Sequence, residues 1–211
     1  MSKVGKILKD HYRNTIIKHG AGSKGVDWGE SELNTDIRHE MMLNIIKEKD
    51  EMISILDVGC GYGAFYEYIN KKNLNVNYTG IDIVSEMIDL GINRNQGAEM
   101  ICDDFLDHDF KDEKYDYVIC NGILTQKVTA SISEMNEFAN KLIKKMYFLC
   151  GTGIVFNVMS THVNFQKDNL YYRNPSELMS WCMSEISPHI KLDAAYPLTY
   201  EYTMYVYKPL E

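Results

Sequence analysis

The sequence has few prolines, no long apolar run and no apolar leader, and each shortage excludes a class of protein. Only four prolines and fourteen glycines occur among 211 residues, which excludes collagen-like and low-complexity chains. No stretch approaches the roughly 18 apolar residues that a membrane-spanning helix needs. The first residues are charged and lack the apolar core of a secretory signal. We therefore expect a cytoplasmic protein that does not enter the membrane.

Cysteine usage argues against both a disulfide framework and a zinc site. The five cysteines are odd in number, widely spaced and never arranged as a Cys-x-x-Cys pair. We expect reduced thiols within the core. The acidic run at 103–109 has the composition of a hard-metal site, but its members are too close in sequence to converge on one ion. The sequence therefore predicts no bound metal.

Basic residues are in deficit, with 22 Lys and Arg against 30 Asp and Glu, a formal net charge of −8. Phosphate backbones need a basic surface, so nucleic acid is a poor candidate for a partner. The exception is the stretch 1–25, which has six basic residues and one acidic residue. Its spacing predicts an amphipathic helix over 2–18, which either packs on the body as a lid or presents a basic face to an anionic partner. The oligomeric state stays open.

The rest of the chain alternates strands and helices. Such alternation predicts an α/β fold, with a mostly parallel sheet covered by helices on both faces. We expect one domain over 1–211, comprising an N-terminal lid helix and loop (1–33) and a core (34–211). Strands are expected at 52–56, 76–81, 98–102, 115–120, 153–158, 191–195 and 202–207, and helices from Asn34 or Thr35, at 63–72, from a Ser85 cap to 93, at 131–146 and at 175–186.

A glycine-rich turn follows the first strand of this core. Gly59 and Gly61 fit a dinucleotide fingerprint if Ala64 is the third member, and a G-x-G-x-G pattern if Gly63 is. Asp57, at the end of the strand, discriminates between them. A carboxylate there would repel a pyrophosphate, but it suits a ligand that carries an amine and a sulfonium cation. S-adenosylmethionine has both charges and no phosphate.

The segment Asp57-Val-Gly-Cys-Gly-Tyr-Gly resembles the first motif of the class I S-adenosylmethionine-dependent methyltransferases, with Gly59, Cys60 and Gly61 against the cofactor. The resemblance implies a Rossmann-like three-layer α/β/α sandwich with a seven-stranded sheet, whose last strand, at 202–207, runs antiparallel. It also implies that S-adenosylmethionine is the cofactor and S-adenosylhomocysteine the product.

Further matches follow in order along the chain. Asp82 ends the second strand, where the family's acid accepts both ribose hydroxyls, and Ile83 and Met87 would line the adenine pocket. After the third strand, Asp104 followed by Phe105 matches the acid that faces the adenine amino group.

Asp103 is the alternative to Asp104 for the adenine role, although the family's acid is usually followed by an apolar residue. After the fourth strand, the backbone near Asn121 would hold the methionine amine of the cofactor. Each of these positions is an acid or a turn at the carboxyl end of a strand, where ligands of parallel sheets bind.

Five residues outside these motifs are candidates for the site. His162, His11 and Tyr12 could contact or deprotonate an acceptor, and Trp28 could stack on the cofactor. Arg38 could pair with the cofactor carboxylate, as arginines on the preceding helix do in similar methyltransferases. For each of them, packing or surface exposure is the alternative interpretation.

The acceptor can be narrowed only by exclusion. The fourth strand is followed by Asn121-Gly-Ile-Leu, without the Asn-Pro-Pro-aromatic run of adenine-amino methyltransferases. Together with the acidic composition, this favours methyl transfer to an oxygen or nitrogen of a small molecule, which would be anionic if the basic first helix closes over the site. The alternatives are a protein or RNA methyltransferase, a nicotinamide-dependent oxidoreductase and a non-catalytic cofactor-binding protein.

Overall fold

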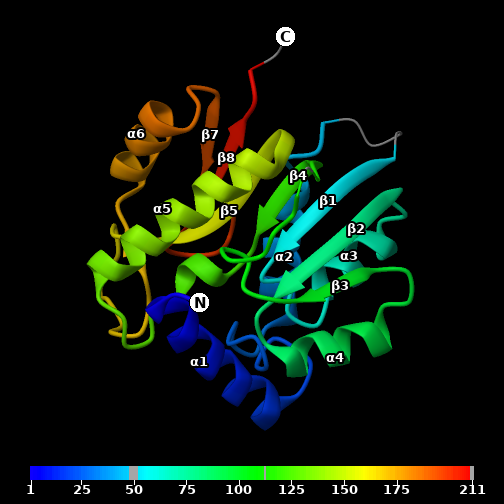
Figure 1. The fold of residues 1–211 in the computed structure, drawn as a ribbon. Coiled ribbons are helices and arrows are strands. Elements are labelled where there is room, and N and C mark those ends of the chain that lie inside the picture. Colours follow the sequence, from blue (N-terminus) through cyan, green and yellow to red (C-terminus); the bar gives the residue numbers. More distant parts are fainter. Residues whose placement is uncertain (48–51, 112, 210–211) are drawn as a thin grey trace.

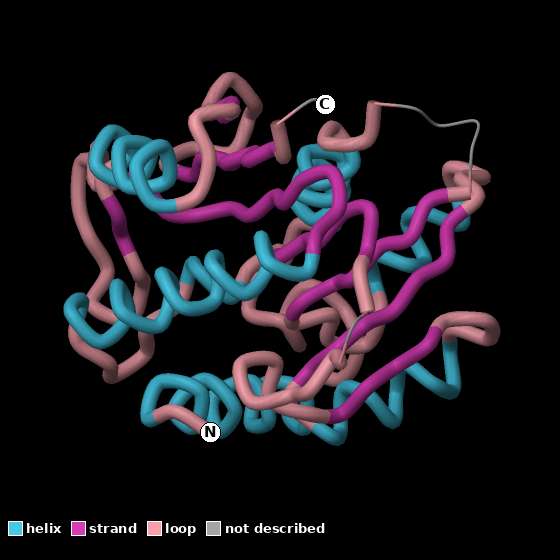
Figure 2. The backbone as a smooth tube through the Cα atoms, turned by 45° about the horizontal axis from the view of Figure 1, so that its top comes forward, coloured by secondary structure: helices cyan, strands magenta, loops and turns pink. Residues whose placement is uncertain are grey.

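The computed structural model describes residues 1–47, 52–111 and 113–209. It has a central sheet with helices on both faces (Figures 1 and 2), which confirms the expected three-layer architecture. The strands of the sheet are β1 (Ile53–Val58), β2 (Val76–Asp82), β3 (Glu99–Cys102), β4 (Tyr115–Cys120), β5 (Cys150–Ser160), β6 (Tyr172–Arg173), β7 (Ile190–Asp193) and β8 (Glu201–Tyr207).

The main path of the sheet has the order β3-β2-β1-β4-β5-β8-β7. All neighbours on this path pair in parallel except β8, which runs antiparallel to both β5 and β7. The antiparallel direction of the last strand is therefore confirmed. The sheet has one strand more than the seven that were predicted. This strand is β6, whose two residues pair only with the end of β5.

Two apolar layers separate the sheet from its helices. The helices are α1 (Lys3–His19), α2 (Glu32–Leu43), α3 (Ala64–Lys71), α4 (Ser85–Arg94), the short 3₁₀ helix η1 (Ile123–Thr125), α5 (Ile132–Leu149) and α6 (Pro175–Glu185). Buried side chains of α5 and α6 pack on one face of the sheet, and those of α2 and α3 pack on the other. Helix α1 packs beside α4, near the carboxyl ends of β1, β2 and β3 (Figure 1).

Two helix starts differ from the prediction. Helix α2 begins earlier than expected, because the Ser31 side chain caps it by accepting a hydrogen bond from the Asn34 amide. The predicted caps, Asn34 and Thr35, lie inside the helix. Ser85 is the first residue of α4 and not its cap, since Val84 holds that position. A polar residue one position inside a helix start gives almost the same sequence signal as a true cap.

No helix in the described part of the chain combines the length and the apolar character that crossing a membrane requires.

Candidate active site

The glycine turn after β1 has a backbone that only glycine adopts readily. Gly59, Gly61 and Gly63 all have φ in the left-handed region, at 74°, 56° and 79°. A Cβ atom on Gly59 would lie 2.4 Å from the end of the Ile123 side chain, which would have to shift. The amide of Gly59 donates to the Ile81 carbonyl at 2.8 Å. The turn is thus fixed on the end of β2, with its backbone open to a ligand.

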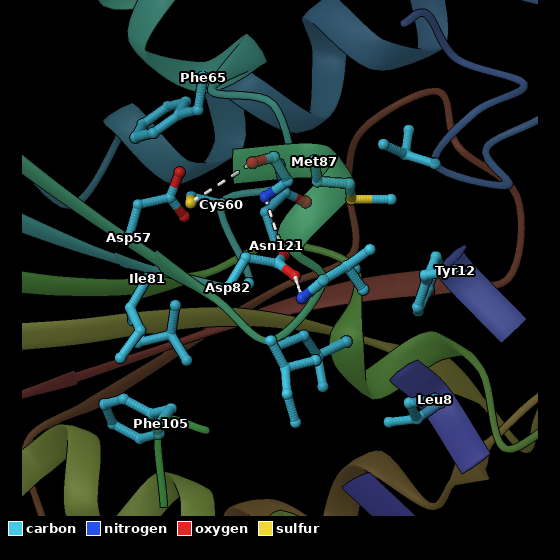
Figure 3. A pocket seen from close by; sticks show the side chains of 18 of the residues that line it. Leu8, Tyr12, Asp57, Cys60, Phe65, Ile81, Asp82, Met87, Phe105 and Asn121 are labelled. Atoms are coloured by element: carbon cyan, nitrogen blue, oxygen red, sulfur yellow. Dashed lines mark hydrogen bonds between the residues drawn. The ribbon is translucent and has the colours of Figure 1, made fainter. Parts of the chain in front are cut away.

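A crevice opens at this edge of the sheet, between the strand ends and the N-terminal segment. Figure 3 shows Leu8 and Tyr12 of α1 facing residues of the strand ends across it. Eleven of the twelve predicted cofactor residues line the crevice, namely Trp28, Asp57, Gly59, Cys60, Gly61, Asp82, Ile83, Met87, Asp104, Phe105 and Asn121. The structure therefore brings the sequence motifs together, and their individual roles stay predictions.

Asp57 lies beneath the glycine turn and is only 2% exposed. Burial raises the pKa of its carboxyl to about 7, against the opposing effect of a hydrogen bond from the Tyr78 hydroxyl at 2.7 Å. The nearby charge of Asp82 raises it further. Because a cation in the crevice would favour the ionised form, this carboxyl is suited to a positively charged ligand.

Asp82 joins the end of β2 to the glycine turn. Its Oδ2 accepts from the Gly61 amide at 2.9 Å, and its Oδ1 accepts from the Val84 amide at 2.8 Å. Burial raises the pKa of this carboxyl, while the backbone N–H donors oppose the shift. Each carboxylate oxygen can accept a second hydrogen bond, so the group can also bind hydroxyls in the crevice.

The structure distinguishes Asp104 from its neighbour Asp103. Asp104 Oδ1 accepts from the Leu106 amide at 2.9 Å, whereas its Oδ2 is buried and has no hydrogen-bond partner among the described residues. Asp103 is exposed, and its Oδ2 lies 2.8 Å from His108 Nδ1. An unsatisfied buried acceptor is costly unless a ligand satisfies it, so the geometry favours Asp104 for the adenine role.

The turn after β4 presents a second unsatisfied group. Asn121 is 8% exposed, and both polar atoms of its side chain are buried without a partner among the described residues. The next residue, Gly122, has φ of 105°, and its amide donates to Asn157 Oδ1 at 2.7 Å. The Gly122 carbonyl accepts from the Thr125 hydroxyl at 2.6 Å. The backbone of this turn is thus held firmly, while the Asn121 side chain forms no hydrogen bond with any residue that the structure describes.

Arg38 is the predicted cofactor residue that does not line the crevice, which corrects its expected placement. Its guanidinium binds the Glu201 carboxylate, with Nε and Nη2 at 3.0 and 2.9 Å from Oε2, and lies 5.2 Å from the centre of the Trp28 ring. Glu201 is 4% exposed, and a carboxylate so deeply buried needs a cationic partner. Of the three guanidinium nitrogens, Nη1 is the one that is buried without a hydrogen-bond partner among the described residues.

The sequence analysis did not identify two residues of α2 that line the crevice as site residues. Thr35 Oγ1 and His39 Nδ1 are buried without hydrogen-bond partners in the described structure, and both residues line the crevice. Burial, together with the charge of Arg38, lowers the pKa of His39 to about 3, so its ring is neutral. The available signal was the spacing i, i+3 and i+4 of Thr35, Arg38 and His39, which places three polar groups on one helix face.

Comparisons with known proteins agree with this geometry. A family model described as a methyltransferase domain matches residues 55–143. A Mycobacterium tuberculosis protein named as a methyltransferase, Rv1506c, is 30% identical over 160 residues, which cover 74% of this chain and 93% of that protein. The chain belongs to the class I S-adenosylmethionine-dependent methyltransferase family.

Solved methyltransferase structures share the fold over nearly the whole chain. Magnesium protoporphyrin IX methyltransferase from Synechocystis PCC 6803, solved with bound SAM, has a TM-score of 0.67 at 13% identity and 99% coverage of both chains. Phosphoethanolamine N-methyltransferase 2 of Haemonchus contortus has a TM-score of 0.65 at 10% identity, covering 94% of this chain and 60% of that one. At such identities the likeness is one of fold.

The three candidate catalytic residues of the methyltransferase lie in different places. Tyr12 lines the crevice, and burial raises the pKa of its hydroxyl. His11 lies outside it, with Nε2 3.0 Å from Asp27 Oδ2, which also accepts from Gln126 Nε2 at 2.8 Å. His162 lines a separate cavity beside the start of β8, which corrects the expectation that it lies at the site. The strand that precedes His162, β5, continues to Ser160, beyond its predicted end at 158. It pairs there with the start of β8, which is the element that His162 lies beside.

Among the described residues of the methyltransferase, no group of three or more His, Cys, Asp or Glu side chains is arranged to hold a metal ion.

Proposed function

We propose that this methyltransferase transfers a methyl group from S-adenosylmethionine to an oxygen or nitrogen of a small-molecule acceptor. One observation carries the proposal. The glycine turn after β1, Asp82 after β2 and the unsatisfied Asp104 Oδ2 after β3 stand in a row along one crevice. A nucleoside joined to an amino acid needs groups of these types in this order, and the row contains no phosphate-binding cation.

Each part of the cofactor has a matching group. Asp104 Oδ2 would accept from the adenine amino group, and Asp82 would accept from the ribose hydroxyls. The cofactor carboxylate would lie near α2, where Thr35 Oγ1, His39 Nδ1 and Arg38 Nη1 have no hydrogen-bond partner in the described part of the chain. In this arrangement Arg38 would contribute to binding the cofactor carboxylate through Nη1 alone, because its other nitrogens bind Glu201. These unsatisfied atoms support a polar ligand, because buried polar groups in folded proteins are otherwise hydrogen-bonded.

The main chemical task of the protein is to align the acceptor with the methyl group of the cofactor. The sulfonium of S-adenosylmethionine supplies an already activated methyl group, so the chain must orient the acceptor and exclude water. We propose that residues 1–33 act as the lid that does so, over the core formed by 34–211. In support, Leu8 and Tyr12 of α1 and Trp28 of the following loop line the crevice opposite the strand ends. Tyr12 is the candidate catalytic residue that this placement favours.

An anionic acceptor has weaker support than the sequence alone suggested. Of the four basic residues on which this hypothesis depends, Lys3, Lys6, Lys9 and Arg13, two pair with other helices, since Lys3 Nζ lies 2.7 Å from Glu134 and Arg13 Nε lies 2.5 Å from Glu86. The hypothesis now rests on Lys6 and Lys9. Neutralising both should raise KM for an anionic acceptor and leave KM for a neutral one unchanged.

Calorimetry with S-adenosylhomocysteine and with NAD tests the cofactor. We expect binding of the first only, and binding of NAD would support the oxidoreductase alternative. Incubation with methyl-labelled S-adenosylmethionine and a metabolite extract tests the acceptor, and we expect a small product heavier by one methylene group. Label in the macromolecular fraction of a lysate would favour a protein or RNA acceptor. Cofactor binding without any labelled product would favour the non-catalytic alternative.

A further inference from the structure

Asn157 is a carboxamide that is fully buried within β5. Its chain neighbours, Phe156 and Val158, are buried apolar residues. Both polar atoms of its side chain are satisfied, since Oδ1 accepts from the Gly122 amide at 2.7 Å and Nδ2 donates to Glu201 Oε1 at 2.9 Å. A β-branched apolar side chain would suit a buried strand position better, so the two hydrogen bonds, and not packing, explain a carboxamide at this place.

The bond to Glu201 connects Asn157 to α2. Alternation along β5 places Asn157 on the same face of the sheet as Val155, which belongs to the apolar layer between the sheet and α2 and α3. Glu201 is on that face too, because Thr203, two positions further along β8, pairs with Asn157. Arg38 of α2 meets Glu201 there, with Nη2 2.9 Å from Oε2. A continuous polar chain therefore crosses this layer from α2 to the turn after β4.

The bond to Gly122 fixes the direction of the Asn121 carbonyl. The Gly122 N–H and the Asn121 C=O belong to one peptide unit, which is planar and trans. The two groups of such a unit point in opposite directions, so holding the N–H on Asn157 turns the carbonyl away from Asn157. The backbone that is expected to hold the cofactor amine is therefore oriented by a side chain of the neighbouring strand, β5.

The other end of the polar chain lies where the cofactor carboxylate is proposed to bind. Arg38 Nη1 is buried there without a hydrogen-bond partner among the described residues, and Thr35 and His39 of the same helix line the crevice. S-adenosylmethionine carries its ammonium and its carboxylate on one carbon atom, so the groups that bind them must keep a fixed separation. A chain of hydrogen bonds between those groups can maintain it.

We propose that Asn157 is a positioning residue for the amino acid part of the cofactor, and that the chain formed by Arg38, Glu201 and Asn157 sets the distance between the carboxylate-binding and ammonium-binding groups. This inference rests on the proposed function. Asn157 does not line the crevice, so its effect passes through the Gly122 amide. Its loss should therefore weaken binding of the amino acid part and leave binding of the nucleoside part unchanged.

5′-Methylthioadenosine separates these two contributions. It has the nucleoside and the thioether sulfur of S-adenosylhomocysteine and lacks the ammonium and the carboxylate. Calorimetry should show that Asn157→Leu weakens S-adenosylhomocysteine binding about tenfold or more and changes the Kd of 5′-methylthioadenosine less than about twofold, because only the turn after β4 loses its anchor. Asn77→Leu, which replaces an exposed asparagine of β2, is the matched control and should leave both affinities unchanged.

An exchange of groups tests the hydrogen bonds themselves. Glu201→Gln removes the charge that Arg38 needs and places a carboxamide opposite Asn157, so it should also weaken S-adenosylhomocysteine binding selectively. Adding Asn157→Asp brings one carboxylate and one carboxamide back into contact in exchanged positions, and should return the Kd to within about threefold of that of the unaltered protein. These two proteins decide the question if Asn157→Leu does not fold.

Three results would overturn the inference. Equal losses for both ligands would mean that Asn157 supports the fold in general, and no loss for either in the folded variants would mean that the turn keeps its place without it. Failure of the double variant to recover the affinity lost by Glu201→Gln would show that the hydrogen bonds do not carry the effect. Failure of the unaltered protein to bind S-adenosylhomocysteine would instead overturn the proposed function.

Discussion

Three acids at the ends of β1, β2 and β3, of which Asp57 and Asp104 are buried and Asp82 is partly buried, differ in the hydrogen bonds that they already accept. Asp57 accepts from the Tyr78 hydroxyl and Asp82 from two backbone amides, whereas Asp104 accepts from one amide and its Oδ2 has no partner among the described residues. These differences follow from the local backbone and not from the residue type. Because of these differences, Asp57 is suited to shaping the electrostatics of the crevice, and Asp82 and Asp104 are suited to direct contact with a ligand.

Replacing Asp82 by alanine should weaken S-adenosylhomocysteine binding by about 1–3 kcal/mol, because a charged acceptor for the ribose hydroxyls is lost together with the bonds that hold Gly61 and Val84. Calorimetry measures the change. Asp89→Ala, an exposed acid on α4, provides the matched control. An Asp82→Ala protein with the affinity of the unaltered chain would remove Asp82 from the ribose role.

Asp57 should make the stability of the free protein depend on pH. Its pKa of about 7 lies above that of an unfolded aspartate, so the unfolded chain loses this proton first. The stability contributed by the protonated carboxyl is complete below about pH 4 and is lost as the pH rises towards 7. The side chain of Asp57→Asn stays neutral and loses no such stability. The unfolding free energy of the variant, relative to that of the unaltered protein, should therefore rise by about 2–4 kcal/mol between about pH 4 and pH 7.

Urea unfolding at a series of pH values measures the effect of Asp57→Asn. Asp89→Asn should follow the unaltered protein throughout, since its side chain is exposed. Parallel stability curves for Asp57→Asn and the unaltered protein would show that Asp57 is ionised at little cost in the fold.

At the scale of single elements, the sequence predicted most helices and strands because apolar periodicity determines which face is buried. Their ends were less certain. Ser131 and Glu134 form a capping box, a pattern that the sequence displays, whereas Ser85 presented a similar signal one residue inside α4. The strand β6 has two residues and no periodicity of its own. It exists because the chain passes beside the end of β5, which only the folded structure determines.

The capping box gives a prediction at this scale. Ser131→Ala should lower the unfolding free energy by about 0.5–2 kcal/mol, because the Glu134 amide loses the acceptor that lies 3.2 Å away. Chemical denaturation measures the loss. Ser176→Ala, an exposed serine inside the first turn of α6 whose hydroxyl is not the cap, should change stability by less than about 0.5 kcal/mol. Equal effects of the two substitutions would show that the cap contributes nothing specific.

At the scale of the whole molecule, the site divides into a part that was predictable and a part that was not. The motif residues after β1, β2, β3 and β4 are short segments whose order fixes their positions at one sheet edge. Thr35 and His39 become part of the site only because α2 packs beside the glycine turn. The pairing of Arg38 with Glu201 joins residues 163 positions apart, and no local pattern indicates it.

The ion pair between Arg38 and Glu201 connects distant parts of the fold to the site. Glu201 Oε1 also accepts from Asn157 Nδ2 at 2.9 Å, and Asn157 Oδ1 holds the Gly122 amide at 2.7 Å. The chain of bonds therefore runs from α2 through the start of β8 and through β5 to the turn that carries Asn121. A substitution of Glu201 should therefore perturb the turn after β4 as well as the core.

Glu201→Ala should lower the unfolding free energy by about 3–5 kcal/mol, because it leaves the Arg38 guanidinium buried without its counter-charge. The double variant Arg38→Met with Glu201→Leu should be more stable than Glu201→Ala, since no uncompensated charge remains. Urea unfolding compares them. Glu185→Ala, which removes the exposed partner of Lys144, should cost less than about 1 kcal/mol. If Glu201→Ala costs no more than this surface variant, water reaches Arg38 in solution, and the pair does not hold the turn after β4.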